Sequence, residues 1–247
     1  MNLADPQSFD GFAEQYDAAV SIERSHDFFL KSLPERRGSV LEIGCGTGLL
    51  AYELSHHFSS VVALDISEPM LTIARKKRSA PNIEYQCSDA NKLTVETSFD
   101  AIVSHTTFHH LTSIPETVSA VRAALAPGGR LILLDCITRF GPIIPRWTIC
   151  YYAYAGLQLL PDSVRRGFEA AWTLFRFRCS RQWIAHLKSD RYLTREQFRE
   201  VYASLLPGAQ FTCMKTFIGV VWTAPREHRM RKEPNHALQP TPLARRG

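Results

Sequence analysis

The sequence predicts an α/β fold in which a mainly parallel sheet of about seven strands carries helices on both faces. Apolar runs of the strand type alternate with helical patterns five times between residues 39 and 135. The first run leads directly into a turn with three glycines, and two more strand-like runs, expected as a C-terminal antiparallel pair, lie near residues 210–216 and 218–223. This order is typical of repeated β-α units that share one sheet.

Length and composition fit one large globular domain or a domain with an insertion. The 247 residues are 45% hydrophobic and 21% charged, which is enough for a substantial core. The net charge of +5 is misleading, because residues 225–247 carry six basic side chains against two acidic ones. The rest of the chain is nearly neutral, so we expect no nucleic-acid partner.

The six cysteines indicate free thiols and a cytoplasmic location. They are scattered, with no C-x-x-C pair and no spacing typical of a metal site, so we expect neither a disulfide framework nor a bound metal. The N-terminus has no signal-peptide pattern. The most apolar stretch, residues 143–160, is interrupted by Pro145, Arg146 and Gly156 and is therefore a poor membrane span.

A strand that breaks into a glycine turn organises the first part of the chain. Two amphipathic helices are expected over residues 8–19 and 22–33, covering the sheet edge, followed by a buried strand at residues 40–43. Gly44, Gly46 and Gly48 then lead into a helix that runs to about Phe58. Glycines permit positive φ and let a ligand approach the backbone, so this turn predicts a ligand cradle.

The next two strands are each followed by a carboxylate. Residues 61–65 form an apolar strand ending in Asp65, where a carboxylate beside the glycine turn can accept hydrogen bonds from both hydroxyls of a ribose. The alternatives for Asp65 are a helix cap or a surface acid, but Ser67 already suits the cap of the helix that starts at Glu68. The third strand, residues 82–87, is followed by Asp89, for which an Asx turn that ends the strand is an alternative to ligand binding.

The fourth and fifth strands complete the alternation. They are predicted at residues 99–104 and 130–135. Between them, Ser113 and Glu116 have capping-box spacing at the start of a helix, which the Pro-Gly-Gly sequence at residues 127–129 ends. In a parallel sheet the carboxyl ends of the strands lie at one edge, so this arrangement predicts a single ligand-binding rim there.

The motifs resemble those of class I S-adenosylmethionine (SAM) methyltransferases, specifically the methyltransferase type 11 group of quinone-biosynthesis and natural-product enzymes. The G-x-G-x-G spacing, with Glu42 two residues before the first glycine, looks like their first motif, and the turn at residues 126–131 (APGGRL) is also typical of them. The resemblance covers residues 8–135. It implies a Rossmann-like doubly wound sheet, SAM as cofactor and S-adenosylhomocysteine (SAH) as product.

The resemblance also implies roles for individual residues. Tyr16 would cover the SAM site, and Asp89 would bond the adenine amino group with Ala90 under the ring. The cofactor-binding residues expected from the motifs, the strand ends and the resemblance are Tyr16, Glu42, Gly44, Cys45, Gly46, Gly48, Asp65, Ile66, Asp89, Ala90 and Ser104.

Residues 136–190 depart from the pattern and are interpreted as a helical cap that forms the acceptor site. The segment holds ten of the 26 aromatic residues, and eight basic residues against three acids. Its length suits a functional insertion over the SAM pocket. An aromatic-rich subdomain core and a peripheral surface that meets anionic lipid are the alternatives.

The end of the domain returns to the pattern. Thr194 and Gln197 have capping-box spacing before a helix, and residues 191–224 supply this last helix and the closing strand pair of the domain that begins with residues 1–135. Residues 225–247 are rich in Pro and Arg without periodicity, which predicts a disordered basic tail.

The predicted reaction is transfer of the SAM methyl group to an O, N or C nucleophile of a small, apolar or aromatic acceptor. His109, and after it His105 and His110, are the candidates for a catalytic base, because imidazole titrates near neutral pH. Acceptors that are already acidic, such as carbon nucleophiles in quinone-like rings, need no strong base. The rival functions are an NAD(P)-dependent oxidoreductase, which the glycine spacing and the absence of a Tyr-x-x-x-Lys pair disfavour, and a non-catalytic SAM-fold binding protein.

Overall fold

The computed structural model describes residues 9–23, 25–93, 98–138, 148–189 and 192–226. Its strands form one sheet in the order β3-β2-β1-β4-β5-β8-β7, with β6 beside β5. The strands are β1 Ser39–Ile43, β2 Ser60–Asp65, β3 Ile83–Cys87, β4 Phe99–His105, β5 Leu125–Thr138, β6 Leu193–Thr194, β7 Gln210–Cys213 and β8 Phe217–Thr223. Strands β1 to β5 are parallel, and β8 is antiparallel to both β5 and β7. The predicted fold class is confirmed.

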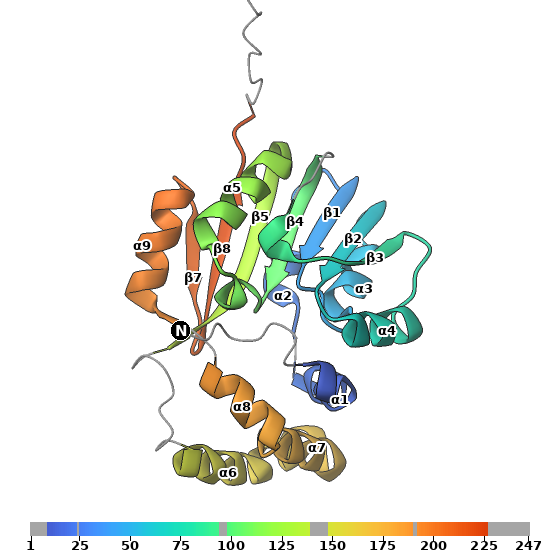
Figure 1. Cartoon of the computed structure of the whole chain (residues 1–247), viewed down its shortest axis with the longest axis vertical. Helices are drawn as coiled ribbons and strands as arrows, with labels where there is room; N and C mark the ends of the chain where they lie inside the picture. The colour runs from blue at the N-terminus through green and yellow to red at the C-terminus, as the bar shows by residue number, and fades with distance from the viewer. Residues whose placement is uncertain (1–8, 24, 94–97, 139–147, 190–191, 227–247) are drawn as a thin grey trace, which may run out of the picture.

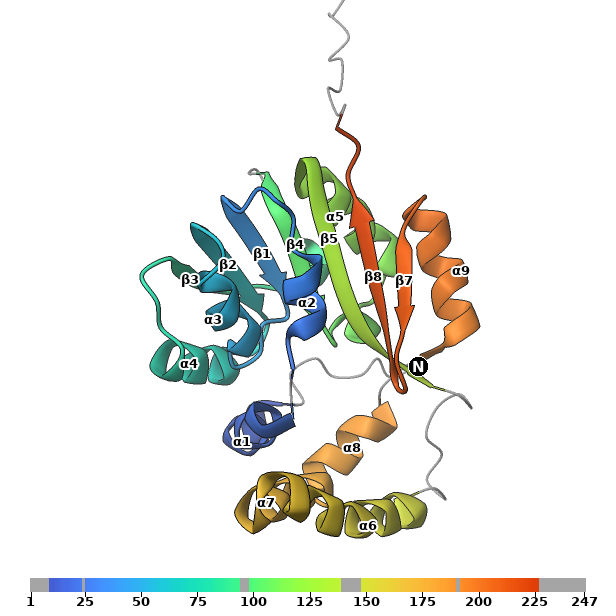
Figure 2. The same cartoon turned by 180° about the vertical axis from the view of Figure 1, so that it is seen from behind.

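Helices cover both faces of the sheet (Figures 1 and 2). Figure 1 shows α5 and α9 on one face, and the reverse view in Figure 2 shows α2 and α3 on the other. The helices around the sheet are η1 Asp10–Phe12, α1 Ala13–Glu23, α2 Asp27–Ser32, α3 Leu49–Ser55, α4 Glu68–Lys77, η2 Ala90–Lys92, η3 Phe108–His110, α5 Ile114–Ala124 and α9 Arg195–Leu205.

The strands are buried on both sides because their apolar residues alternate between two cores. Leu41 and Ile43 of β1 belong to the core that includes Val118 of α5, whereas Val40 belongs to the core that includes Leu50 of α3. Successive strand residues point to opposite faces, so a near-continuous apolar run is what a sheet covered on both sides requires.

The predicted cap segment forms three helices beyond the carboxyl ends of the parallel strands. These are α6 Thr148–Arg166, α7 Phe168–Arg178 and α8 Arg181–Ser189. Leu174 and Phe177 of α7 pack with Phe12 and Tyr16 of the N-terminal segment in a third apolar core. The cap and the N-terminal helices therefore hold each other in place at this edge of the sheet.

The structure departs from the sequence-based expectations at the fifth strand. Strand β5 begins at Leu125, before the Pro-Gly-Gly turn rather than after it. Phe99 pairs with Leu125 while Ala101 pairs with Arg130, so the intervening residues of β5 form a bulge inside the strand. The two-residue β6 was also not expected from the sequence.

Several expectations concern residues that the structure does not describe. Residues 227–247, which make up most of the predicted disordered tail, lie outside the described ranges, as do residues 139–147 of the predicted cap. Among the helices that are described, none is both long and apolar enough to cross a membrane.

Candidate active site

The glycine turn between β1 and α3 needs glycine for two different reasons. Gly44, Gly46 and Gly48 have φ values of +74°, +53° and +82°, a region that costs other residues strain. A Cβ on Gly44 would lie 2.1 Å from Thr107 Oγ1, so this position also has no room for a side chain. A Cβ on Gly46 would meet nothing nearer than Tyr16 Cε1 at 4.0 Å. The backbone at Gly46 therefore faces open space.

Asp65, at the end of β2, is bonded to the glycine turn. Its Oδ2 accepts a hydrogen bond from the Gly46 N–H at 2.7 Å, and its Oδ1 accepts one from the Ser67 N–H at 2.9 Å. Burial raises the pKa of this carboxyl, and the two backbone donors oppose that shift. Ser67 in turn caps α4 by accepting from the Met70 N–H, as predicted.

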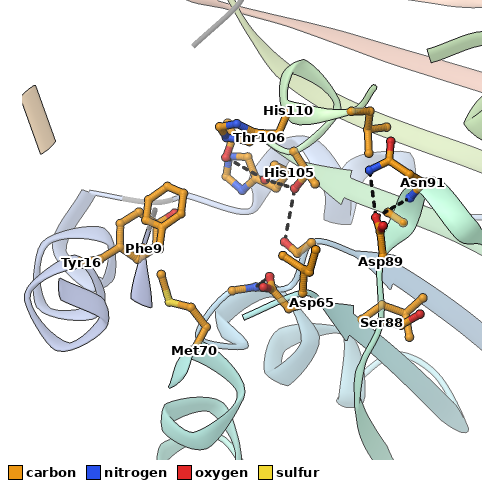
Figure 3. Close-up of a pocket in the computed structure, with 17 residues that line it drawn as sticks. Phe9, Tyr16, Asp65, Met70, Ser88, Asp89, Asn91, His105, Thr106 and His110 are labelled. Atoms are coloured by element: carbon orange, nitrogen blue, oxygen red, sulfur yellow. Dashed lines mark hydrogen bonds between the residues drawn. The ribbon is translucent and has the colours of Figure 1, made fainter. Parts of the chain in front are cut away.

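A pocket opens where these elements meet, at the carboxyl ends of β1, β2 and β4 (Figure 3). The space not filled by protein at this site is about 760 Å³, a volume that includes open solvent. Figure 3 shows Phe9 and Tyr16 on one side, Asp89 and Asn91 on the other, and Asp65 between them. The residues predicted as site residues that line it are Tyr16, Gly44, Gly46, Asp65, Ile66, Asp89, Ala90, His105 and His110.

Five predicted site residues do not line this pocket, namely Glu42, Cys45, Gly48, Ser104 and His109. Ser104 is buried, and its hydroxyl donates to the Ile43 carbonyl at 2.8 Å, which ties β4 to β1. Glu42 and Cys45 are also buried, and burial raises the pKa of the Cys45 thiol, as do the negative charges of Glu42 and Asp65.

The carboxylate of Asp89 makes a local turn and lines the pocket at the same time. Its Oδ1 accepts hydrogen bonds from the Asn91 N–H at 2.9 Å and from Asn91 Nδ2 at 2.8 Å. Asn91 Oδ1 accepts in turn from the Thr112 N–H. The Asx turn that the sequence left open for Asp89 is therefore present, and it fixes the carboxylate at the pocket wall.

Two histidines at the far side of the pocket are neutral. The His110 ring lies 5.2 Å from that of His186 of α8. Burial, followed by repulsion from neighbouring His109 and His186, lowers the pKa of His110 to about 2. Burial, followed by repulsion from His109, lowers the pKa of His186 to about 3. Near neutral pH both rings therefore offer one N–H and one lone pair, and they are weak bases.

His109 turns away from the pocket and pairs with Asp135 of β5. Its Nδ1 lies 2.5 Å from Asp135 Oδ1, and its backbone N–H donates to Asp135 Oδ2 at 3.0 Å. The Cys136 N–H also donates to Asp135 Oδ1. The ring of His109 lies 4.0 Å from that of His110, so the pair sits directly behind the pocket wall. Such a carboxylate fixes the tautomer with a proton on Nδ1.

An aromatic wall from the N-terminal segment and the cap bounds the pocket opposite Asp89. The Phe9 ring lies 4.9 Å from that of Tyr16 and 4.3 Å from that of His186. Trp183 stacks on His186 at 5.2 Å, and its Nε1 donates to the Tyr151 hydroxyl of α6. Helix α8 therefore packs behind the pocket wall, where His186 contacts the lining residues Phe9 and His110.

Sequence reasoning missed several residues at this site. Asp135 carried a usable signal, because the strand predicted at residues 130–135 ends in this carboxylate, as the strand predicted at residues 61–65 ends in Asp65. His186 carried none, since nothing in the local sequence distinguishes it from a surface histidine. The other pocket residues that were not anticipated are Phe9, Leu64, Met70, Ser88, Asn91, Thr106, Thr107 and Leu111.

Known proteins similar to this chain are methyltransferases. Residues 40–129 match the family model described as "Methyltransferase domain". The chain is 31% identical over 132 residues to malonyl-[acyl-carrier protein] O-methyltransferase of Bacillus cereus, covering 50% of this chain and 49% of that protein. It is 32% identical over 151 residues to demethylmenaquinone methyltransferase of Symbiobacterium thermophilum, covering 55% and 60%. The chain thus spans about half the length of the curated relatives it matches.

Solved structures share the fold over most of the chain. The DhpI–SAH complex matches with a TM-score of 0.58 at 19% identity, over 91% of this chain and 98% of that one. The plantazolicin methyltransferase BpumL with SAH matches with a TM-score of 0.59 at 12% identity, over 90% and 95%. At these identities the likeness concerns the fold. The matched methyltransferase domain covers residues 40–129, and the fold that the chain shares with these structures extends beyond it.

Proposed function

We propose that this chain binds SAM in the pocket beside Gly46 and Asp65 and transfers its methyl group to a small-molecule nucleophile. The observation that carries the proposal is the glycine turn. Gly46 has a positive φ, and the position of its missing Cβ faces open pocket rather than protein. A backbone of this kind lets a ligand approach closely, and the pocket lies where α/β sheets bind ligands.

The pocket residues fit the parts of SAM. Asp65 is assigned to the ribose hydroxyls, because a carboxylate can accept two hydrogen bonds from a diol. Asp89 is assigned to the adenine amino group, with Ile66 and Ala90 as apolar neighbours of the ring. Tyr16 and Phe9 are assigned to closing the site and excluding water. The bound cofactor supplies a methyl group on a positively charged sulfur, and the protein supplies orientation.

The acceptor side of the pocket favours an apolar or aromatic molecule. The Phe9 ring and the neutral His110 ring line the pocket there, and the rings of His186 and Trp183 pack behind them. We assign residues 136–190 to the cap of this acceptor site. The named relatives are a malonyl-[acyl-carrier protein] O-methyltransferase and a demethylmenaquinone methyltransferase, so an oxygen acceptor is compatible with the domain.

For a hydroxyl acceptor, His109 is the best candidate for the base. The Nδ1 of His109 lies 2.5 Å from Asp135 Oδ1, and a carboxylate in that position orients an imidazole for proton transfer. His109 lies behind His110, so in this role the proton of the acceptor hydroxyl must pass the pocket wall to reach His109. An acceptor whose carbon nucleophile is already acidic would need no proton transfer to His109.

We also assign the protein to a reducing compartment such as the cytoplasm. All six cysteines lie among the described residues and are free thiols, which is the usual state where thiols are kept reduced.

Calorimetric titration of SAM and SAH tests the cofactor assignment. Asp65→Asn should weaken SAH binding about ten-fold or more, which corresponds to about 1.4 kcal/mol. The matched control is Glu84→Gln, which changes an exposed carboxylate on the neighbouring strand β3 outside the pocket. A folded wild-type protein that binds neither ligand would overturn the proposal, and binding of NADPH instead would restore the oxidoreductase alternative.

A further inference from the structure

The outward face of α6 is apolar, although a helix at a water-facing surface normally turns its apolar face inward. The side chains with the largest exposed fractions on this face are Ile149 (79%), Leu157 (75%), Leu160 (74%) and Val164 (80%). At about 100° per residue they lie within an arc of about 80°, and they extend about 22 Å along the helix. We call these four residues the α6 face.

The helix cannot turn this face inward, because its opposite side is already engaged. Ala155 and Asp162 are buried there. Asp162 Oδ2 accepts a hydrogen bond from Arg178 of α7 at 2.7 Å, and the Tyr151 hydroxyl accepts one from Trp183 of α8 at 2.9 Å. The exposure of the α6 face is thus fixed by the packing of the cap.

Exposed aromatic residues continue the apolar surface at its rim. Tyr152 and Tyr154 are 40% and 51% exposed, and Phe168 stacks on Trp172 with their centroids 6.2 Å apart. Figures 1 and 2 show α6 and α7 at the end of the molecule farthest from the sheet, with α1 and α8 in between. A helical surface that carries amphipathic Tyr and Trp side chains suits the water–lipid boundary.

The charge around this surface is positive. Helices α6, α7 and α8 carry six basic side chains against two acidic ones, Asp162 and Glu169. Asp162 is buried against Arg178, so Glu169 is the one exposed acid in the three helices as the structure describes them. Arg165, Arg176 and Arg181 are exposed. Basic side chains beside an apolar helical face attract anionic lipid headgroups.

We propose that the α6 face docks on an anionic lipid bilayer, with α6 lying in the plane of the interface. A second copy of the chain fits this surface less well, because a two-fold contact would bring the same positive side chains together. This inference concerns membrane association alone and does not depend on methyl transfer.

Flotation of the purified full-length chain with vesicles tests the proposal. Vesicles of phosphatidylcholine mixed with an equal amount of phosphatidylglycerol should carry the protein, and vesicles of phosphatidylcholine alone should carry much less. The double variant Leu157→Gln, Leu160→Gln should lower the partition coefficient at least about ten-fold, since it removes two large apolar side chains from the interface. The double variant Arg165→Gln, Arg176→Gln should lower it about five-fold per residue on anionic vesicles.

A matched pair of tyrosines provides the control. Tyr152 beside the α6 face and Tyr52 on α3 have the same exposed fraction, 40%, so Tyr152→Gln should weaken flotation while Tyr52→Gln should not. Circular dichroism confirms that each variant is folded. The proposal is overturned if the folded wild type does not float with anionic vesicles. It is also overturned if sedimentation velocity shows a dimer that the leucine double variant dissociates while vesicles remain unbound, because the face would then join two copies.

Discussion

The buried pair His110 and His186 makes folding stability depend on pH in a way that can be calculated. The ordinary pKa of histidine is 6.5, and burial lowers the pKa values of these two to about 2 and about 3 in the folded protein. Above about pH 6.5 both rings are neutral whether the chain is folded or not. Below it, the unfolded chain binds protons that the folded chain does not, so stability falls progressively down to about pH 3.

The size of the effect follows from the ordinary pKa value. A pH of about 5 is roughly 1.5 units below the ordinary pKa of histidine, and each unit is worth about 1.4 kcal/mol. Each histidine therefore lowers the free energy of unfolding by about 2 kcal/mol. The pair should remove about 4 kcal/mol between about pH 7 and pH 5. This is a large part of the stability of a typical domain.

Urea unfolding at the two pH values measures the difference. The double variant His110→Asn, His186→Gln lacks both titrating groups and should lose about 4 kcal/mol less than the wild type over this range. His56→Gln, at the exposed end of α3, is the matched control and should behave as the wild type does. If the double variant loses as much stability as the wild type, these histidines are protonated in the folded protein and the reasoning is refuted.

Two further predictions separate folding from function. Gly46→Ala should lower the free energy of unfolding by about 1 kcal/mol, from its positive φ alone, and should abolish SAH binding. Gly44→Ala should lower the free energy of unfolding by more than about 2 kcal/mol, because its Cβ overlaps Thr107. Urea unfolding measures the stability losses, and calorimetry measures the SAH affinity. Equal stability losses for the two variants would contradict the assignment of the open space beside Gly46 to a ligand. Asp135→Asn should lower kcat about ten-fold or more and change the pH–rate profile, with the SAH affinity unchanged, since it frees the His109 ring. A parallel loss of SAH affinity would show that Asp135 only supports the fold.

Much of the cofactor half of the protein could be predicted because its signals are local. Period-two burial and apolar runs determine a strand within a few residues, and they located β1 to β4 closely. The positive φ of Gly44 and Gly46 is a steric requirement of the turn itself, and the position of Asp65 at the end of β2 follows from sequence order alone. These constraints act between neighbours along the chain, so the sequence shows them directly.

Only the tertiary structure decided which way the chemical groups point. His109 and His110 are adjacent in the sequence, yet one pairs with Asp135, 26 positions away, and the other faces the pocket. Ser104 is at the rim in sequence order, but its hydroxyl is used inside the sheet.

The orientation of the cap helices was also decided by the tertiary structure. The sequence indicated an aromatic and basic insertion, but the packing of α6 against α7 and α8 determined that its apolar face is outward and that His186 packs behind His110 of the pocket wall. Side-chain direction at strand ends and on inserted helices depends on partners that are distant in sequence, and periodicity contains no information about them.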